Sequence, residues 1–316
     1  MVLLIYRIFI YLILIFSPLI ILVRILKKKE DVYRFKEKFC FFSKKKIKKN
    51  LVWFHGASVG EISSIIPIVF SLEKNKKIDQ ILITSSTLSS AKVFKQFKFK
   101  KTIHQFFPVD TNNMSRKFLN YWKPSLAIFI DSEIWPNMIL NLKKKSIPIF
   151  LLNARITQKS FNRWKMLPNF SKKIFQCIDK SIVSNQETKK YLKYLGVKNI
   201  KSVGNLKFIQ NKFKKLYLPE ELKKHISNKT TWCAASTHNG EEQISMNIHK
   251  KLKKKYDNLL SVIIPRHIDR SEELVEMFKE NNLKVHCHSW KTQIPKNIDV
   301  YLVDTYGETE KFFNLI

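Results

Sequence analysis

The sequence predicts an α/β protein with two Rossmann-like halves, each a doubly wound parallel sheet, behind an apolar N-terminal segment. Two patterns predict the sheets: apolar runs of strand length alternate with segments of helix length, and this rhythm starts near Leu51 and again near Thr231. A third pattern, an uncharged stretch close to the N-terminus, predicts a membrane helix. In sheets of this kind, ligands bind at the carboxyl ends of the strands.

The N-terminal segment reads IFIYLILIFSPLIILV from Ile8 to Val23. With the residues back to Leu3, it approaches the roughly 20 residues that cross a bilayer. The RILKKKE that follows favours a single membrane anchor with the rest of the chain in the cytoplasm, because basic clusters stay on that side. A helix lying in the membrane interface, kinked at Pro18, is the alternative. A cleaved signal peptide is not favoured, because no small-x-small site follows.

The first half contains an alternation of apolar strands and helices. Its predicted strands are LVWFH, QILITSS, LAIFID, IPIFLLN, KSIVSN and NIKSVGN. Helices are expected to begin at about Glu61 and near Ser89. Because these strands are apolar along their whole length, they are expected to be buried on both faces of a parallel sheet.

The second half offers only three or four strands, among them TWCAAST, LLSVIIPRH and VYLVDT. Its helices are predicted in EEQISMNIHKKLKKKY and SEELVEMFKEN, and GETEKFFNLI begins a last one. A doubly wound domain normally has more strands, so this half is expected to be incomplete and the chain truncated. The predicted division is an anchor at 1–26, a basic connector at 27–50, a first domain at 51–205, a linker at 206–229 and a second domain at 230–316.

The charge is strongly positive: 58 lysines and arginines stand against 25 acidic residues, a net charge of +33. Such an excess favours anionic partners, such as nucleic acid, anionic lipid or phosphorylated ligands. The abundance of Lys, Ile, Asn and Phe beside only six glycines also indicates an AT-rich coding bias, which scatters lysines over solvated faces. The four cysteines form no C-x-x-C pair, which predicts neither a disulfide framework nor a cysteine zinc site.

The loop after the first strand carries the most specific local pattern. Residues 56–60 read G-x-S-x-G, the pattern of a serine-hydrolase nucleophile elbow with Ser58 as nucleophile. Such an elbow needs an earlier strand to supply the oxyanion loop, and here the elbow strand is the first one after the anchor. The same residues form a capping box, in which Ser58 and Glu61 satisfy each other's backbone amides. The loop and helix N-terminus would also suit an anionic ligand.

A series of motifs resembles the bacterial Kdo transferases, which attach 3-deoxy-D-manno-octulosonic acid (Kdo) to lipid A precursors. The resemblance runs from Leu51 to the end of the chain, in order. Its motifs are WFHGASVGEISSIIPIV, ITSSTLSSAKVF, FFPVDTNNMSRKFLNYWKPSLAIFIDSEIWPNMI, IPIFLLNARITQKSFNRW, VGNLKF, STHNGEE, VIIPRH and VDTYGE.

The resemblance implies a GT-B fold, with two Rossmann-like domains facing a cleft, and inverting transfer of Kdo from CMP-Kdo to lipid IVA without a metal or other cofactor. The first domain would bind the acceptor and the second the CMP-sugar, and the anchor would lie in the bacterial inner membrane. Neither the donor nor the acceptor is a nucleic acid, so no nucleic-acid partner is expected.

The resemblance also implies roles for individual residues. Glu61 would be the general base, with Glu133 and Lys207 supporting the transition state. The segments that contact CMP-Kdo would contain Pro265, Arg266, Tyr306, Gly307 and Glu308. Further cleft candidates are Ser58, Asn153, Arg155, Ser236, Thr237 and His238.

Two departures from the family are visible. The family more often has Met where Tyr306 stands, and it continues well beyond Ile316 with segments that complete the CMP site. We therefore expect weak donor binding, or no activity, from this chain by itself. Two alternatives stay open: a membrane-anchored serine hydrolase using Ser58, and a non-enzymatic basic protein that binds membranes or nucleic acid. Asp131 and Glu133 also resemble a metal-binding D-x-D pair, and His286 and His288 flank Cys287 in a weak metal pattern.

Overall fold

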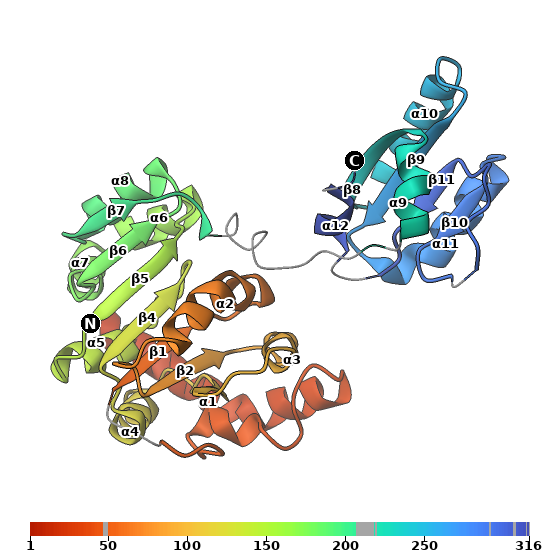
Figure 1. The fold of residues 1–316 in the computed structure, drawn as a ribbon. Coiled ribbons are helices and arrows are strands. Elements are labelled where there is room, and N and C mark those ends of the chain that lie inside the picture. The colour runs from red at the N-terminus through yellow and green to blue at the C-terminus, as the bar shows by residue number, and fades with distance from the viewer. Residues whose placement is uncertain are drawn as a thin grey trace. The chain divides into compact units, whose positions relative to one another are not determined.

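The computed structural model describes residues 1–46, 50–206, 218, 220–290, 292–305, 308–313 and 315. The chain divides into two compact units, residues 1–213 and 214–316, which we call unit 1 and unit 2 (Figure 1). Each unit contains its own sheet, and every strand pair in both sheets is parallel. The predicted α/β class with two parallel sheets is confirmed.

Unit 1 is built on a seven-stranded sheet in the order β3-β2-β1-β4-β5-β6-β7. The strands are β1 (Leu51–His55), β2 (Gln80–Ser85), β3 (Thr102–Phe106), β4 (Leu126–Ile130), β5 (Ile149–Ala154), β6 (Lys180–Val183) and β7 (Ile200–Ser202). The strand order reverses between β1 and β4, so this is the switch point at which a doubly wound sheet opens a ligand crevice. Six of these strands match the predicted ones, and β3 was not predicted.

The helices of unit 1 follow the strands in turn. They are α1 (Val2–Leu26), the 3-10 helix η1 (Phe35–Phe39), α2 (Val59–Glu73), α3 (Leu88–Lys95), α4 (Asn112–Trp122), α5 (Pro136–Lys144), α6 (Gln158–Lys165), α7 (Pro168–Phe175) and α8 (Gln186–Leu195). Several start at a side-chain cap: Ser58, Thr87 and Thr111 each accept a hydrogen bond from an amide three residues on. These caps fix where the chain turns from strand to helix at the carboxyl edge of the sheet.

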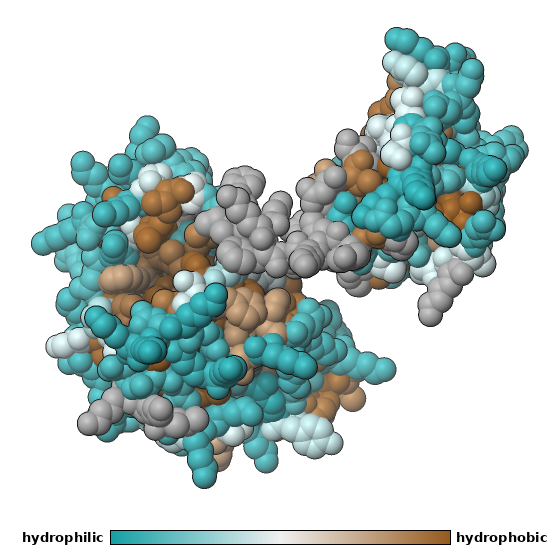
Figure 2. Space-filling model, viewed as in Figure 1, coloured by the Kyte–Doolittle hydropathy of each residue, from teal (hydrophilic) through white to brown (hydrophobic). Residues whose placement is uncertain are grey.

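The core of unit 1 is aromatic on one face of the sheet and aliphatic on the other. Trp53, Trp122 and Phe129 are among the large side chains buried on the first face. The second face holds a cluster around Phe54 and Ile65. No described helix lies in front of β4, β5 and β6 in Figure 1, and Figure 2 shows apolar residues there. An apolar groove of about 290 Å³ lies on this face; its lining includes Val52, Ile68, Ile128, Phe150, Leu152 and Ile182.

Unit 2 is built on a four-stranded sheet in the order β10-β11-β9-β8. The elements are α9 (Glu220–Ser227), β8 (Thr230–Thr237), α10 (Glu241–Lys253), β9 (Leu259–Pro265), η3 (Ile268–Arg270), α11 (Ser271–Glu280), β10 (Val285–Cys287), β11 (Val300–Leu302) and α12 (Thr309–Phe313). Helix α9 falls within the stretch 206–229 that the sequence predicts as a linker, and its Leu222 and Ile226 are buried in the core of unit 2.

Left-handed backbone is carried mostly by residues other than glycine. Among the described residues, eight non-glycine residues have positive φ: Lys28, Cys40, Lys123, Asp131, Ser146, Asn153, Ser236 and Asn282. Three of them lie at the carboxyl ends of strands, with φ of 56° at Asp131, 55° at Asn153 and 60° at Ser236. Backbone strain of this kind often accompanies functional sites.

Candidate active site

The loop after β1 folds back on the first turn of α2 and holds the carboxylate of Glu61. The Ser58 hydroxyl donates to Glu61 Oε1 at 2.7 Å, and the Ala57 amide donates to Glu61 Oε2 at 2.7 Å. In return, the Glu61 amide donates to Ser58 Oγ at 3.3 Å. A Cβ on Gly56 would lie 3.0 Å from Glu61 Cβ, so glycine at this position leaves room for the fold-back. The predicted capping box is therefore formed in one direction: Ser58 caps the Glu61 amide, but the Glu61 carboxylate accepts from the Ala57 amide and the Ser58 hydroxyl in place of the Ser58 amide.

The bonds of Ser58 do not resemble those of a hydrolase nucleophile. Among the described contacts, its hydroxyl pairs with Glu61 and not with a histidine. The nearest histidine in the sequence, His55, pairs instead with Thr84 and Glu133. The serine–histidine pair of a hydrolase elbow is thus not found among the described contacts, and the mutual bonds of Ser58 and Glu61 give the pattern a structural explanation.

A second carboxylate, Glu133, lies beyond β4 and is held from β1, the neighbouring strand. His55 Nε2 lies 3.2 Å from Glu133 Oε2, and Trp135 Nε1 donates to the same oxygen at 2.8 Å. The other ring nitrogen of His55 lies 3.0 Å from Thr84 Oγ1 and 3.2 Å from the Thr84 carbonyl. The His55 ring is fully buried and stacks on Phe107 with 3.8 Å between centroids. Glu133 is thus held by one ring in the core and by the half-buried ring of Trp135, which packs against that core.

The two carboxylates have opposite pKa shifts. Burial raises the pKa of Glu61, and the nearby charges of Glu133 and Asp131 raise it further against the hydrogen bonds from Ser58 and Ala57. Burial would also raise the pKa of Glu133, but the bonds and charge of His55 and the bond from Trp135 hold this pKa below its usual value. Carboxylates whose environments separate their pKa values in this way can take different acid–base roles.

Asp131, Asn153 and Arg155 lie beside these carboxylates, at the ends of β4 and β5. Asn153 Nδ2 donates to Asp131 Oδ1 at 3.1 Å, and the Leu206 amide donates to Asn153 Oδ1 at 3.0 Å. The side chain of Arg155 is exposed. Lys207 lies outside the described residues. Among the described residues, no cluster of three or more His, Cys, Asp and Glu side chains could hold a metal ion, so Asp131 and Glu133 are not part of such a group.

The carboxyl edge of unit 2 brings the ends of β8 and β9 together. The Arg266 amide donates to the Thr237 carbonyl at 2.9 Å, and the Thr237 hydroxyl donates to the buried Glu242 at 2.8 Å. The side chains of Ser236, His238 and Arg266 are exposed, whereas Pro265 is buried. The edge thus presents polar and cationic groups to solvent at the start of α10, where helix amides favour an anion.

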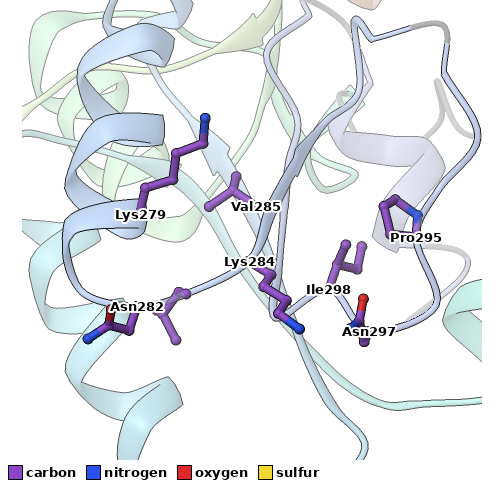
Figure 3. Close-up of a pocket in the computed structure, with 8 residues that line it drawn as sticks. Lys279, Asn282, Lys284, Val285, Pro295, Asn297 and Ile298 are labelled. Atoms are coloured by element: carbon purple, nitrogen blue, oxygen red, sulfur yellow. The ribbon is translucent and has the colours of Figure 1, made fainter.

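The end of β11 is described only in part. Tyr306 and Gly307 lie outside the described residues. Glu308 lies 2.7 Å from Lys311 Nζ and 3.9 Å from His288 Nε2. A cavity of about 620 Å³ opens nearby; its lining includes Asp269, Glu272, Glu276, Ser289, Trp290 and Asp304. Another cavity, of about 530 Å³ and lined in part by Lys279, Lys284 and Asn297, lies at the amino ends of β10 and β11, away from this edge (Figure 3).

The predicted site residues that the structure describes therefore lie at two carboxyl edges, one in each unit. The sequence interpretation missed His55, whose partner lies 78 residues away, and the acidic cavity of unit 2. The sequence does contain a signal for the pairing of His55 with Glu133: a histidine ends one buried strand, and a glutamate follows another. The unit 1 edge can take a proton from a hydroxyl, and the unit 2 edge can bind an anion.

Comparisons with known proteins agree on one family. A family model described as "3-Deoxy-D-manno-octulosonic-acid transferase (kdotransferase)" matches residues 33–210. A 3-deoxy-D-manno-octulosonic acid transferase of Rickettsia bellii is 35% identical over 302 residues, which cover 94% of this chain and 71% of that protein. The same-named protein of Rickettsia felis is 34% identical, over 84% of this chain and 58% of its own length. The chain thus spans between about half and three quarters of the length of these relatives.

Solved structures support the fold. A Listeria monocytogenes protein described as a UDP-N-acetylglucosamine 2-epimerase has a TM-score of 0.61 at 13% identity, over 85% of this chain and 72% of its own. The UDP-GlcNAc 2-epimerase of Neisseria meningitidis has a TM-score of 0.57 at 15% identity, over 84% and 75%. At such identities the likeness concerns the fold alone, and it confirms the predicted GT-B class.

Proposed function

Because this chain belongs to the 3-deoxy-D-manno-octulosonic acid transferase family, we propose that it serves lipopolysaccharide biosynthesis as an inverting glycosyltransferase. The proposed donor is CMP-Kdo and the proposed acceptor is lipid IVA. Unit 1 would hold the acceptor and the base, and unit 2 the CMP-sugar. The observation that carries the proposal is the environment of Glu61 at the switch point of the first sheet.

Glu61 is proposed as the general base. A sugar hydroxyl becomes a good nucleophile only when a group within hydrogen-bond reach takes its proton. Burial raises the pKa of Glu61, which makes its carboxylate a stronger base than an exposed one. The bonds from Ser58 and Ala57 fix both carboxylate oxygens of Glu61. An incoming acceptor hydroxyl would take the place of the Ser58 hydroxyl as the donor to Glu61 Oε1. Ser58 therefore positions the base rather than attacking the sugar.

Glu133 is proposed to stay ionised and to stabilise positive charge that develops on the Kdo ring. Inverting transfer of this kind passes through an oxocarbenium-like state, for which a fixed carboxylate is a preorganised partner. The ring N–H groups of His55 and Trp135 would hold the Glu133 side chain in one orientation. Asn153 and Arg155 line the same edge.

Arg266 is proposed to bind the CMP phosphate, with Ser236, Thr237 and His238 beside it. An exposed guanidinium can form two parallel hydrogen bonds with phosphate oxygens. Lys207, Pro265, Tyr306, Gly307 and Glu308 complete the proposed donor site by their positions in the family motifs.

The test is mass spectrometry of lipid products after the full chain is incubated with CMP-Kdo and lipid IVA. A mass gain of one or more Kdo units would show more activity than the weak or absent activity that the sequence predicts for this chain by itself. The rate of that gain should fall about 10²–10⁴-fold in Glu61→Gln, the range that a general base contributes. Ser58→Ala is the matched control, because it removes one bond to Glu61 and keeps the base. A mass gain equal in wild type and Glu61→Gln would overturn the role of Glu61, and no gain in wild type would overturn the activity of this chain.

A further inference from the structure

Helix α1 begins in direct contact with the carboxyl edge of unit 1. The Tyr6 hydroxyl donates to Asp110 Oδ2 at 2.8 Å. Arg7 donates through Nε to Asn137 Oδ1 at 2.9 Å and through Nη2 to Asn112 Oδ1 at 3.4 Å. These three bonds join the start of the apolar helix to residues more than a hundred positions away. We call Tyr6, Arg7 and their partners the latch.

In the latch, the Tyr6 hydroxyl bonds to a buried carboxylate that also accepts two backbone amides at the start of α5. Asp110 is 1% exposed and accepts the amides of Asn137 at 3.0 Å and Met138 at 2.8 Å. These are among the first amides of α5, the helix that follows Glu133 and Trp135. The N-terminus of α1 is therefore bonded to the framework of the candidate active site.

The other end of α1 is also tied to unit 1. Arg24 pairs with Glu30 at 2.8 Å, and Lys38 of η1 pairs with the same carboxylate at 2.6 Å. Glu37 of η1 then accepts the amide of Phe106 in β3 at 2.8 Å. Both ends of the helix thus belong to one compact body.

Between its ends, α1 has one shielded stripe and one exposed face. Its shielded or partly shielded residues recur every three or four positions, the spacing of one helical face. They include Leu3, Tyr6, Arg7, Ile10, Leu14, Ser17, Ile21 and Arg24. The exposed face is apolar and includes Ile5, Phe9, Leu12, Phe16, Leu19 and Val23.

The length of α1 conflicts with a membrane span. From Tyr6 to Arg24 the helix rises about 27 Å at 1.5 Å per residue, nearly the thickness of a bilayer core. If α1 crossed the membrane with unit 1 beside Arg24, Tyr6 would emerge on the far side. It could then not reach Asp110, and the latch could not form.

We propose that α1 does not cross the membrane but lies in the plane of an anionic lipid surface, with its exposed apolar face among the acyl chains. The flanking segment has the matching chemistry: Val32, Tyr33 and Phe41 are exposed apolar or aromatic residues, and Tyr33 is 91% exposed. Exposed lysines accompany them at Lys27, Lys28, Lys29, Lys36, Lys44 and Lys45. Apolar side chains at acyl depth, beside lysines at headgroup depth, are the pattern of an interfacial helix. This inference does not depend on the transferase activity.

The test is a topology measurement on the full chain in inner-membrane vesicles. Single added cysteines at Val2→Cys, Lys28→Cys and Lys144→Cys mark the two ends of α1 and the body of unit 1. Each variant is treated with a membrane-impermeant maleimide in inverted and in right-side-out vesicles. The labelled residue is identified by peptide mass, so the native cysteines stay in place.

We expect all three positions to be labelled in the same vesicle orientation. Labelling of Val2→Cys in the orientation opposite to Lys144→Cys would show a span and overturn the proposal. Tyr6→Phe/Arg7→Leu removes the latch donors, and Tyr11→Phe is its matched control. With Val2→Cys added, the double variant is expected to gain labelling in the opposite orientation, since its apolar stretch is longer and unlatched. An unchanged pattern would contradict the role given to the latch.

The lipid class is tested with the purified chain and vesicles of phosphatidylcholine alone or mixed with phosphatidylglycerol. We expect at least about tenfold tighter binding to the anionic vesicles, falling with salt, because several lysines act near the surface. Equal binding to both kinds of vesicle would contradict the proposal that α1 binds an anionic lipid surface.

Discussion

The two carboxyl edges of this chain prepare their functional groups in different ways. In unit 1, Glu133 is held by the buried ring of His55 and the half-buried ring of Trp135, and Glu61 has both oxygens bonded. In unit 2, the side chains of Ser236, His238 and Arg266 are exposed, and only the backbone beneath them is tied down. The first edge is organised before any ligand arrives, whereas the second presents exposed cationic and polar side chains.

This difference fits the chemistry proposed for each edge. A base and a charge-stabilising carboxylate act only if they are held in place, since reorganisation during the reaction would raise the barrier. A phosphate can itself draw an arginine into position. We therefore expect substitutions in unit 1 to change mainly the rate constant, and those in unit 2 mainly the dissociation constant.

After the loss expected for Glu61→Gln, the largest effect is expected at Glu133, the carboxylate that His55 and Trp135 hold in unit 1. Glu133→Gln keeps the size of the side chain but removes its charge, and kcat should fall about 10²–10³-fold, as for loss of a preorganised electrostatic group. Trp135→Phe is the matched variant, because it removes one of two bonds to Glu133 and keeps the carboxylate. Its kcat should fall less than about tenfold. Steady-state transfer assays distinguish the two, and equal losses would mean that Trp135 has a role of its own.

A smaller effect is expected from the exposed arginine of unit 2. Arg266→Ala should raise the dissociation constant of CMP about 10- to 100-fold with little change in kcat, since hydrogen bonds to charged groups contribute about 1.5–3 kcal/mol. Lys284→Ala, at the opposite edge of the same sheet, is the control for the loss of one positive charge (Figure 3). Isothermal titration with CMP measures both variants. If Arg266→Ala changed kcat alone, the proposed division between the edges would fail.

The smallest expected effect is a shift in pH dependence. The base must be ionised, so activity should fall as the pH drops through the raised pKa of Glu61. The charge of Asp131 contributes to that raised pKa. In Asp131→Asn the pKa of Glu61 should therefore be lower, and the acid limb of kcat/KM should move to lower pH. If the acid limb moved to higher pH in Asp131→Asn, the charge of Asp131 could not be raising the pKa of Glu61.

The sequence was most informative where apolar runs and capping patterns coincide. LVWFHGASVGE predicted both strand β1 and the cap of α2, because Ser58 and Glu61 interact over three residues. Strand β3 was missed because His104 and Gln105 interrupt its apolar pattern. Both are buried, and His104 is satisfied from distant segments: its Nε2 lies 2.8 Å from Ser85 Oγ, and its ring Nδ1 lies 3.1 Å from Arg34. The burial of polar residues in a strand depends on partners from distant segments, so the local sequence pattern does not indicate it.

The same distinction applies to the candidate sites. Glu61 and Glu133 could be selected from motifs. The contact between His55 and Glu133, however, depends on β1 and β4 being neighbours, which only the sheet order reveals. The latch between Tyr6 and Asp110 is likewise a contact between remote segments. The interpretations of Lys207, Tyr306 and Gly307 stay predictions, since they lie outside the described residues.

The left-handed residues other than glycine have a consequence for protein engineering. An L-residue with a side chain is disfavoured in this conformation by roughly 1–2 kcal/mol, a penalty that glycine does not have. At Asn153 the side chain joins Asp131 to Leu206, so a glycine there would break the bridge. Lys123 ends α4, and Ser146 lies in the turn after α5, both away from the two carboxyl edges. Thermostabilised versions of the chain can therefore be sought at these two turns without altering the residues proposed to act on the sugar.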